Sequence, residues 1–139
     1  MSLTGGLQRD WLECLEREHD NIRAALEWSL VSDVEAGVAL AGSLWRLWWM
    51  HGYLDEGRAH LAKLLASSPP SASRARAKAL NAAGLLALWQ GDFGPAHSDL
   101  LGSLALAEQI DDGSSAAFAL MFVGRVYRDE GDVEASRVR

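Results

Sequence analysis

The residues of this chain that could perform chemistry are few, and their spacing does not bring them together. Glu18, His19 and Asp20 form the only compact group of acidic and imidazole side chains. Consecutive residues of a helix point in different directions, so this trio cannot converge on one metal ion. The histidines also lack the H-E-x-x-H spacing of a zinc site. We therefore predict no metal site and expect a structural or solvated role for His19. The four histidines of the chain are His19, His51, His60 and His97.

Nucleophile and nucleotide chemistry has no support either. Cys14 is the single cysteine and has no histidine near it in sequence, so we expect a small packing residue. Neither the G-x-S-x-G pattern of a serine nucleophile nor the G-x-x-x-x-G-K-[ST] phosphate loop occurs. The chain is therefore predicted to be no enzyme and to need no cofactor.

The glycines instead mark a repeated turn between helices. Gly84 precedes the Gly91–Phe93 turn by seven residues, and Gly124 precedes the Gly131–Val133 turn by the same number. A related turn occurs at Gly52–Leu54, and the turns recur after 39 and then 40 residues. Self-similarity at such a period is typical of a solenoid of helix pairs, which usually presents a binding surface.

Apolar residues at helical spacing predict the elements that form these pairs. We expect Ser32 to cap the second helix, with Glu35 as its capping-box partner, and Gly52 to end it. Helices are expected at about 7–30, 32–51, 54–66, 73–90, 94–110 and 114–130, with a loop at 67–73 and no strand. The predicted fold is all-α, a right-handed superhelix of antiparallel helix pairs with about seven helices.

The whole chain, residues 1–139, is predicted to be a single helical-repeat domain. We expect an expression leader at 1–6, an N-terminal helix at 7–31 and complete hairpins at 32–67 and 71–110. The third hairpin, at 113–139, is expected to be truncated. Its apolar Leu120, Val123 and Tyr127 then lack cover, which predicts self-association through this hairpin or fraying after about Asp132.

Composition excludes several classes of partner. The formal net charge is −6, which argues against direct contact with nucleic acid. No apolar run approaches the roughly 18–20 residues of a membrane span, so we expect no membrane partner. A single cysteine rules out an internal disulfide and fits a reducing compartment. The expected location is therefore the cytoplasm.

The repeated turns resemble tetratricopeptide repeats. The first hairpin departs from the pattern, because Trp45 stands where a small residue is expected and Gly57 replaces the usual alanine. The interval also exceeds the family's 34 residues, which predicts wider helix spacing. The matching residues are Leu80, Ala83, Gly84, Ala87, Gly91, Asp92, Phe93 and Ala96, then Leu120, Val123, Gly124, Tyr127, Gly131 and Asp132.

A second resemblance lies in the segments 11–28, which contains the string EHDNIRAAL, and 41–58. They are similar to the helical sensor arm of large bacterial transcriptional regulators, the signal-transducing ATPases of the LuxR, AfsR and maltose-regulator type. The resemblance implies an ATPase module and a DNA-binding domain on the same polypeptide, and this chain contains neither. It implies a protein–protein interaction module that binds a peptide or an adjacent domain; the alternative is an arm that senses a small-molecule inducer.

The repeat register places a set of side chains near the concave groove of such a superhelix. Exposed tryptophans there would anchor a partner, and the cations would capture a carboxylate or an acidic segment. The alternative is that the charges are ordinary solvated residues and that tryptophans fill gaps between helices, as expected for Trp11, Trp28, Trp45 and Trp48. The candidate groove residues are Arg46, Trp49, Lys78, Asn81, Trp89, Arg125 and Arg128.

Overall fold

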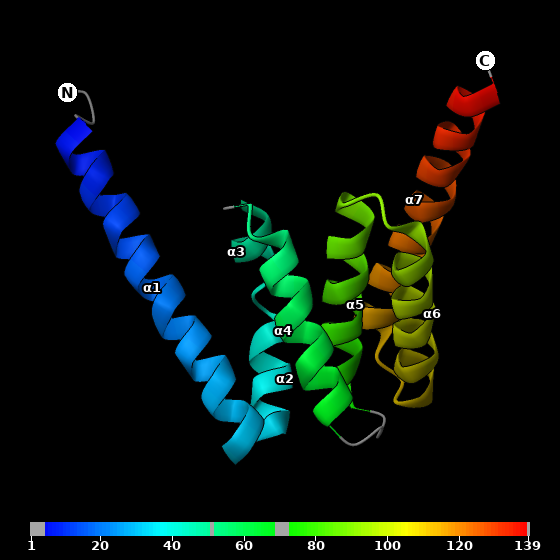
Figure 1. Ribbon diagram of the computed structural model, residues 1–139. Coiled ribbons are helices and arrows are strands. Elements are labelled where there is room, and N and C mark those ends of the chain that lie inside the picture. The colour runs from blue at the N-terminus through cyan, green and yellow to red at the C-terminus, as the bar shows by residue number, and fades with distance from the viewer. Residues whose placement is uncertain (1–4, 51, 69–72, 139) are drawn as a thin grey trace.

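The described part of the chain is helical throughout. The computed structural model describes residues 5–50, 52–68 and 73–138, with side chains at 13, 16–50, 52–68 and 73–135. These ranges contain seven helices and no strand, as predicted (Figure 1). The helices are α1 (Gly5–Ser32), α2 (Val34–Gly42), α3 (Trp45–Met50), α4 (Leu54–Ser67), α5 (Arg74–Trp89), α6 (Phe93–Gln109) and α7 (Gly113–Val138).

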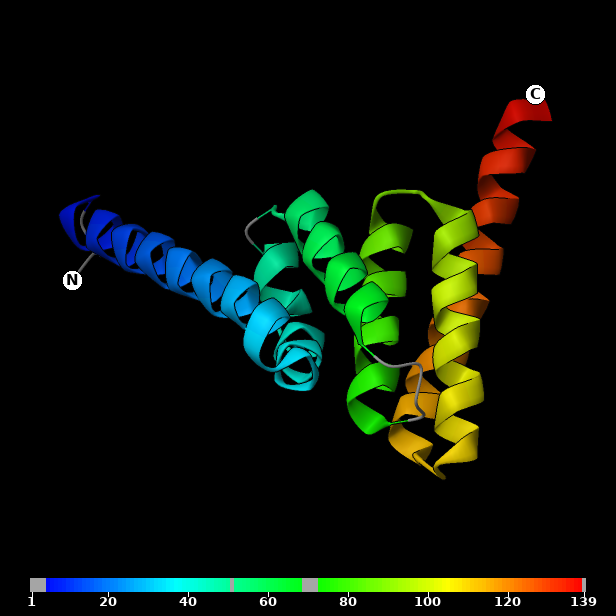
Figure 2. The same cartoon turned by 60° about the horizontal axis from the view of Figure 1, so that its bottom comes forward.

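The helices follow one another across the molecule in sequence order (Figures 1 and 2). Helix α5 is central, because it contacts α2, α3, α4, α6 and α7. The N-terminal half of α1 and the C-terminal end of α7 project away from the other helices in both views. The core therefore lies around α5, where residues 81–88 are all buried.

Close packing of α5 on α6 depends on Gly84, as the repeat pattern predicts. A Cβ atom on Gly84 would lie 2.7 Å from Leu100 Cγ and 3.2 Å from the Ala96 carbonyl oxygen of α6. The turn between the two helices uses Gly91 at φ +74°, a conformation that side chains other than glycine rarely adopt. Its N–H donates to the Leu88 carbonyl at 2.9 Å, which closes the end of α5.

The α3–α4 pair reverses this arrangement of large and small residues. Trp48 of α3 is fully buried, and a Cβ atom on Gly57 of α4 would lie 2.6 Å from its indole ring. The glycine that departs from the repeat pattern thus makes room for a tryptophan. Trp48 fills a gap between helices, as predicted, and Gly52 ends α3 at φ +75°.

The predicted second helix is wrong in two details. It is split into α2 and α3, because the N–H and hydroxyl of Ser43 both bond to the Leu40 carbonyl and end α2. Its N-cap is Asp33, whose carboxylate accepts from the Ala36 N–H at 3.2 Å. Ser32 belongs to the last turn of α1, where its hydroxyl bonds to the Trp28 carbonyl.

The truncated third hairpin predicted at 113–139 is not formed. Helix α7 continues through Gly131 and Asp132 to Val138, so the predicted turn is absent. No described atom lies within 4 Å of a Cβ position on Gly124 or Gly131, which shows that no helix packs there. Without such a contact, breaking the helix would lose hydrogen bonds for no compensating burial. Self-association of this region stays a prediction.

One prediction about a side chain of α1 is wrong. Trp28 does not fill a gap, since 66% of it is exposed, whereas Ile22, Leu26 and Leu30 pack on the core. The contacting residues recur every four positions, and Trp28 lies on the other side of the helix. The predictions for Trp11 and Cys14 concern side chains that lie outside the described residues. Residues 69–72 of the predicted 67–73 loop also lie outside them.

Candidate functional site

Five aromatic side chains from α3, α5 and α7 form one continuous group, which we call the aromatic cluster. Trp49 stacks on Trp89 with 5.0 Å between ring centroids, and Trp45 lies 5.7 Å from Trp89. Phe118 lies 6.2 Å from Trp45 and 4.8 Å from Phe122. Such pairs stabilise beyond their buried area by about 0.5–1.5 kcal/mol each.

Helical spacing explains how the aromatic cluster is assembled. Trp45 and Trp49 are four residues apart on α3, and Phe118 and Phe122 are four apart on α7, so each pair shares one side of its helix. Trp89 is the last residue of α5 and contacts both tryptophans of α3, whereas Trp45 makes the ring contact with Phe118 of α7. Four of the rings are partly buried, but Trp49 is 49% exposed and gives the aromatic cluster a solvent-facing end.

A small pocket of about 170 Å³ lies beside the aromatic cluster. Asn81 is only 5% exposed, and its Nδ2 donates to the Ser115 carbonyl at 3.2 Å. Its Oδ1 is buried and has no hydrogen-bond partner among the described residues. An unsatisfied buried acceptor costs about 1–3 kcal/mol, so this oxygen is unusual. The pocket is lined by Gly42, Trp45, Lys78, Asn81, Ser114, Ser115 and Phe118.

Positive side chains lie next to these aromatic rings. The Arg46 guanidinium carbon lies 5.2 Å from the ring centroid of Trp45, within cation–π range. Lys78 is exposed and lines the pocket. On α7, Arg125 and Arg128 line a hollow of about 410 Å³ together with Phe122, a member of the aromatic cluster.

The two arginines of α7 are less free than the sequence suggested. Arg125 Nε donates to both carboxylate oxygens of Asp129 at 3.1 Å, and Arg128 Nε lies 3.9 Å from the same carboxylate. The i, i+4 spacing of Arg125 and Asp129 was the signal for this pairing. Among the candidate residues, Trp49 and Trp89 thus stack on each other, and Arg46 contacts Trp45. Lys78 and Asn81 line the pocket beside Trp45, and Arg125 and Arg128 line the hollow beside Phe122.

Sequence reasoning missed three members of this site. Trp45 was assigned to gap filling, and Phe118 and Phe122 were not singled out. Their signal is the aromatic pair at i and i+4, which occurs at residues 45 and 49 and again at 118 and 122. That two such pairs meet, through Trp45 and Phe118, depends on the packing of α3 and α7 against α5.

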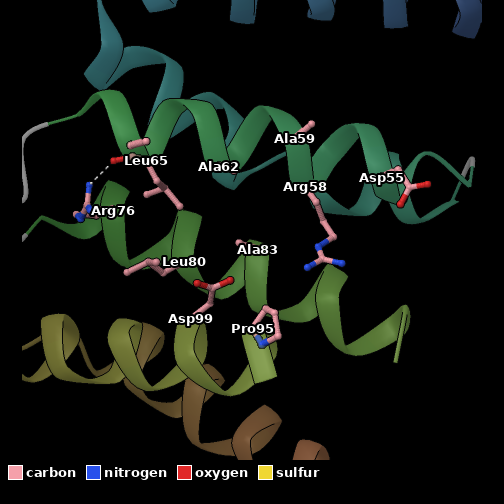
Figure 3. A pocket seen from close by; sticks show the side chains of 11 residues that line it. Asp55, Arg58, Ala59, Ala62, Leu65, Arg76, Leu80, Ala83, Pro95 and Asp99 are labelled. Carbon is pink, nitrogen blue, oxygen red and sulfur yellow. Dashed lines mark hydrogen bonds between the residues drawn. The ribbon is translucent and has the colours of Figure 1, made fainter. Parts of the chain in front are cut away.

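A second and larger hollow lies between α4 and α6, with α5 as its floor (Figure 3). Its volume is about 650 Å³. The Asp99 carboxylate lies in the middle of this groove, between Arg58 and Arg76 (Figure 3). Burial raises the pKa of Asp99 to about 6, although the positive charge of Arg58 lowers it. We call this hollow the α4–α6 groove; the sequence analysis named Leu80 and Ala83 as repeat residues but predicted no site here.

His19 has the structural role that we expected. It is buried at the junction of α1 with α4, where its Nε2 contacts the Glu56 carboxylate and its ring packs edge-on against Tyr53. Arg23 donates to the same carboxylate. Burial pushes the pKa of Glu56 upward, but the hydrogen bonds from Arg23 and His19 outweigh it and lower the pKa.

Metal and membrane sites find no support in the part of the chain that the structure describes. Within those ranges, no group of three or more His, Cys, Asp or Glu side chains is placed to hold a metal ion. None of the described helices combines the length and the apolar character needed to cross a bilayer.

Comparisons with protein-family models, with curated proteins and with solved structures found no match to this chain.

Proposed function

We propose that this chain is a non-catalytic interaction module that binds a peptide or an adjacent protein domain on the face formed by α3, α5 and α7. The Oδ1 of Asn81, which has no partner among the described residues and lies in the pocket lined by Trp45 of the aromatic cluster, carries this proposal. An unsatisfied buried acceptor is retained at a cost in stability, and a binding partner that donates a hydrogen bond removes that cost.

The aromatic and charged residues indicate the chemistry of the partner. Exposed aromatic rings on a packed base are the usual anchors of protein interfaces. Arg46 and Lys78 place positive charge beside them in a chain whose net charge is −6. We infer that the partner segment presents an acidic or carboxylate group to these cations and a hydrogen-bond donor to Asn81.

The wider assignment rests on the resemblance to tetratricopeptide repeats and to regulator sensor arms. The close approach at Gly84 and the turn at Gly91 support a repeat of helix pairs. We therefore propose a right-handed superhelix of antiparallel pairs that acts in the cytoplasm as part of a bacterial transcriptional regulator. In this proposal the module transmits a signal by contact with another protein, and it makes no direct contact with nucleic acid.

The alternative is that the same face senses a small-molecule inducer. The pocket beside Asn81 measures about 170 Å³, below the roughly 300–1,000 Å³ of typical ligand sites. A single inserted side chain fits this volume better than a drug-sized molecule. The size of the pocket therefore favours a protein partner over a small inducer.

Peptides selected from a random display library test the proposal, with affinities measured by fluorescence anisotropy. We expect enriched peptides with acidic residues, and Trp49→Ala to weaken their binding at least tenfold. Trp28→Ala is the matched control, because Trp28 is 66% exposed on α1 and is not part of the aromatic cluster. Equal losses in both variants, or no saturable binder, would refute binding at this face.

A further inference from the structure

The α4–α6 groove is a separate surface from the aromatic cluster. Arg76, Leu80 and Ala83 of α5 line the groove, whereas Lys78 and Asn81 line the aromatic pocket. With 3.6 residues per turn, these two sets lie on opposite sides of α5. An inference about the groove therefore stands independently of the proposed function.

Small apolar residues form most of the wall of the α4–α6 groove. Ala59 and Ala62 come from α4, Leu80 and Ala83 from α5, and Pro95 from α6 (Figure 3). Because these side chains are short, they leave a hollow of about 650 Å³. Apolar walls of this kind suit the alkyl stem of a long charged side chain, which packs its methylene groups on carbon and keeps its head group for a polar partner.

Asp99 presents a carboxylate to the middle of this apolar hollow. It is half-buried, and none of the described residues forms a hydrogen bond or an ion pair with it. Arg58 faces the groove but is already engaged, since it donates to Gln90 at 2.8 Å and to Asp92 at 2.9 Å. The charge of Arg58 acts on Asp99 only from a distance, so this partly desolvated carboxylate has no direct ion-pair partner among the described residues, which favours a positively charged ligand group.

Arg76 lies at the other end of the groove, and its positive charge has no direct carboxylate partner among the described residues. Its Nη1 donates to the Leu65 carbonyl at 3.3 Å and to the Ser68 hydroxyl at 2.6 Å. Both acceptors are uncharged, so the guanidinium is held in place without a described carboxylate to balance its charge. The groove thus has a fixed cation at one end and an unpaired carboxylate in the middle (Figure 3).

We propose that the α4–α6 groove binds a segment of a partner polypeptide that places a lysine or arginine side chain against Asp99 and an acidic side chain near Arg76. The two charges of the segment complement the two unbalanced charges of the groove. The volume exceeds that of one side chain, which favours a polypeptide segment over a free amine. The alanine wall accommodates the alkyl stem that leads to the cationic group.

Short synthetic peptides test this proposal by nuclear magnetic resonance titration of the isotope-labelled full chain. Each probe contains one lysine and one glutamate separated by zero to four alanines, and its control has norleucine in place of lysine. We expect at least one spacing to shift the backbone amides of Ala83 and Asp99 with saturation. Its norleucine counterpart should bind at least tenfold more weakly, and Asp99→Asn should cause a similar loss.

Two further variants test whether Arg76 takes part in peptide binding and whether the aromatic cluster does not. Arg76→Gln should weaken binding of the best peptide several-fold. This variant should also bind that peptide equally well when glutamine replaces its glutamate. Trp49→Ala should leave this binding unchanged. A negative result for the groove is therefore distinct from a negative result for the proposed binding at the aromatic cluster. The proposal is overturned if norleucine peptides bind equally well, if Asp99→Asn has no effect, or if n-butylammonium binds as tightly as the best peptide.

Discussion

At the residue scale, two polar groups are kept where they cost stability. Asn81 has a buried oxygen without a described partner, and Asp99 has a half-buried carboxylate without a hydrogen bond or ion pair among the described residues. In contrast, the buried His19 is matched by Glu56, and the buried Ser103 hydroxyl donates to the Ala77 carbonyl at 2.8 Å. Groups without a described partner are therefore the positions on which we base the two binding proposals.

The pH dependence of stability should report the environment of Asp99. Its folded-state pKa of about 6 lies above the ordinary aspartate value of 3.8, so the folded state favours the protonated acid. The contribution of this group to stability is therefore present at low pH and is lost as the pH rises from about 4 to about 6. Asp99→Asn removes the loss and should stabilise the chain by about 1–2 kcal/mol at pH 7 and by little at pH 4.

Urea unfolding at several pH values measures this difference. The control is Asp132→Asn, which changes an exposed carboxylate on α7 and should alter stability by less than about 0.5 kcal/mol at any pH. If Asp99→Asn instead destabilises the chain at pH 7, the Asp99 carboxylate has a favourable contact within the folded chain in solution.

At the element scale, helices of this chain are joined and spaced by glycines whose roles differ with their contacts. Gly84 is needed because Leu100 and the Ala96 carbonyl of α6 leave no space for a side chain. Gly124 occupies the equivalent position of the repeat on α7, but no described atom lies within 4 Å of its Cβ position. The same pattern therefore has a packing role in one helix and none in the other.

Alanine substitutions at these two glycines should change stability in opposite directions. Gly84→Ala places a methyl group against a backbone carbonyl and should destabilise the chain by about 1–3 kcal/mol. Gly124→Ala improves helix propensity in open space and should stabilise it by up to about 1 kcal/mol. Thermal unfolding followed by circular dichroism compares the two variants directly, and destabilisation by both would indicate that another helix packs against α7 at Gly124 in solution.

At the scale of the whole molecule, the chain buries its core around α5 and leaves one long face of α7 uncovered. Leu120 and Tyr127 on this face are 58% and 60% exposed, and Gly124 lies between them. Seven-residue spacing places all of this stripe on one side of the helix. Apolar surface of this kind is a common site of association.

Self-association through α7 should therefore depend on these two side chains. Leu120→Glu combined with Tyr127→Glu should shift the chain towards monomer at high concentration, with little change in its helical content. Leu101→Glu is the control, since Leu101 is a similarly exposed apolar residue on α6. Analytical ultracentrifugation distinguishes the outcomes, and a wild-type chain that is monomeric at all concentrations would rule out association by this face.

The sequence by itself determined those features that depend on near neighbours in the chain. Apolar spacing located the helices, and the glycines at 52 and 91 marked turns that the structure forms with positive φ. The same reasoning selected Trp49 and Trp89, which stack on each other, and Lys78 and Asn81, which line one pocket. Helix propensity, capping and the i, i+4 relation act over a few residues, which is why a linear pattern reports them.

Tertiary structure alone decided the features that depend on contacts between distant segments. Gly131 shows the same pattern as Gly91, yet only Gly91 forms a turn, because α6 packs on α5 there and no described helix packs against α7 at Gly131. Whether Asn81 Oδ1 and the Asp99 carboxylate find partners was likewise set by residues more than 30 positions away or on other helices. Burial and unmatched polarity are properties of packed surfaces, so they become visible only when the helices are brought together.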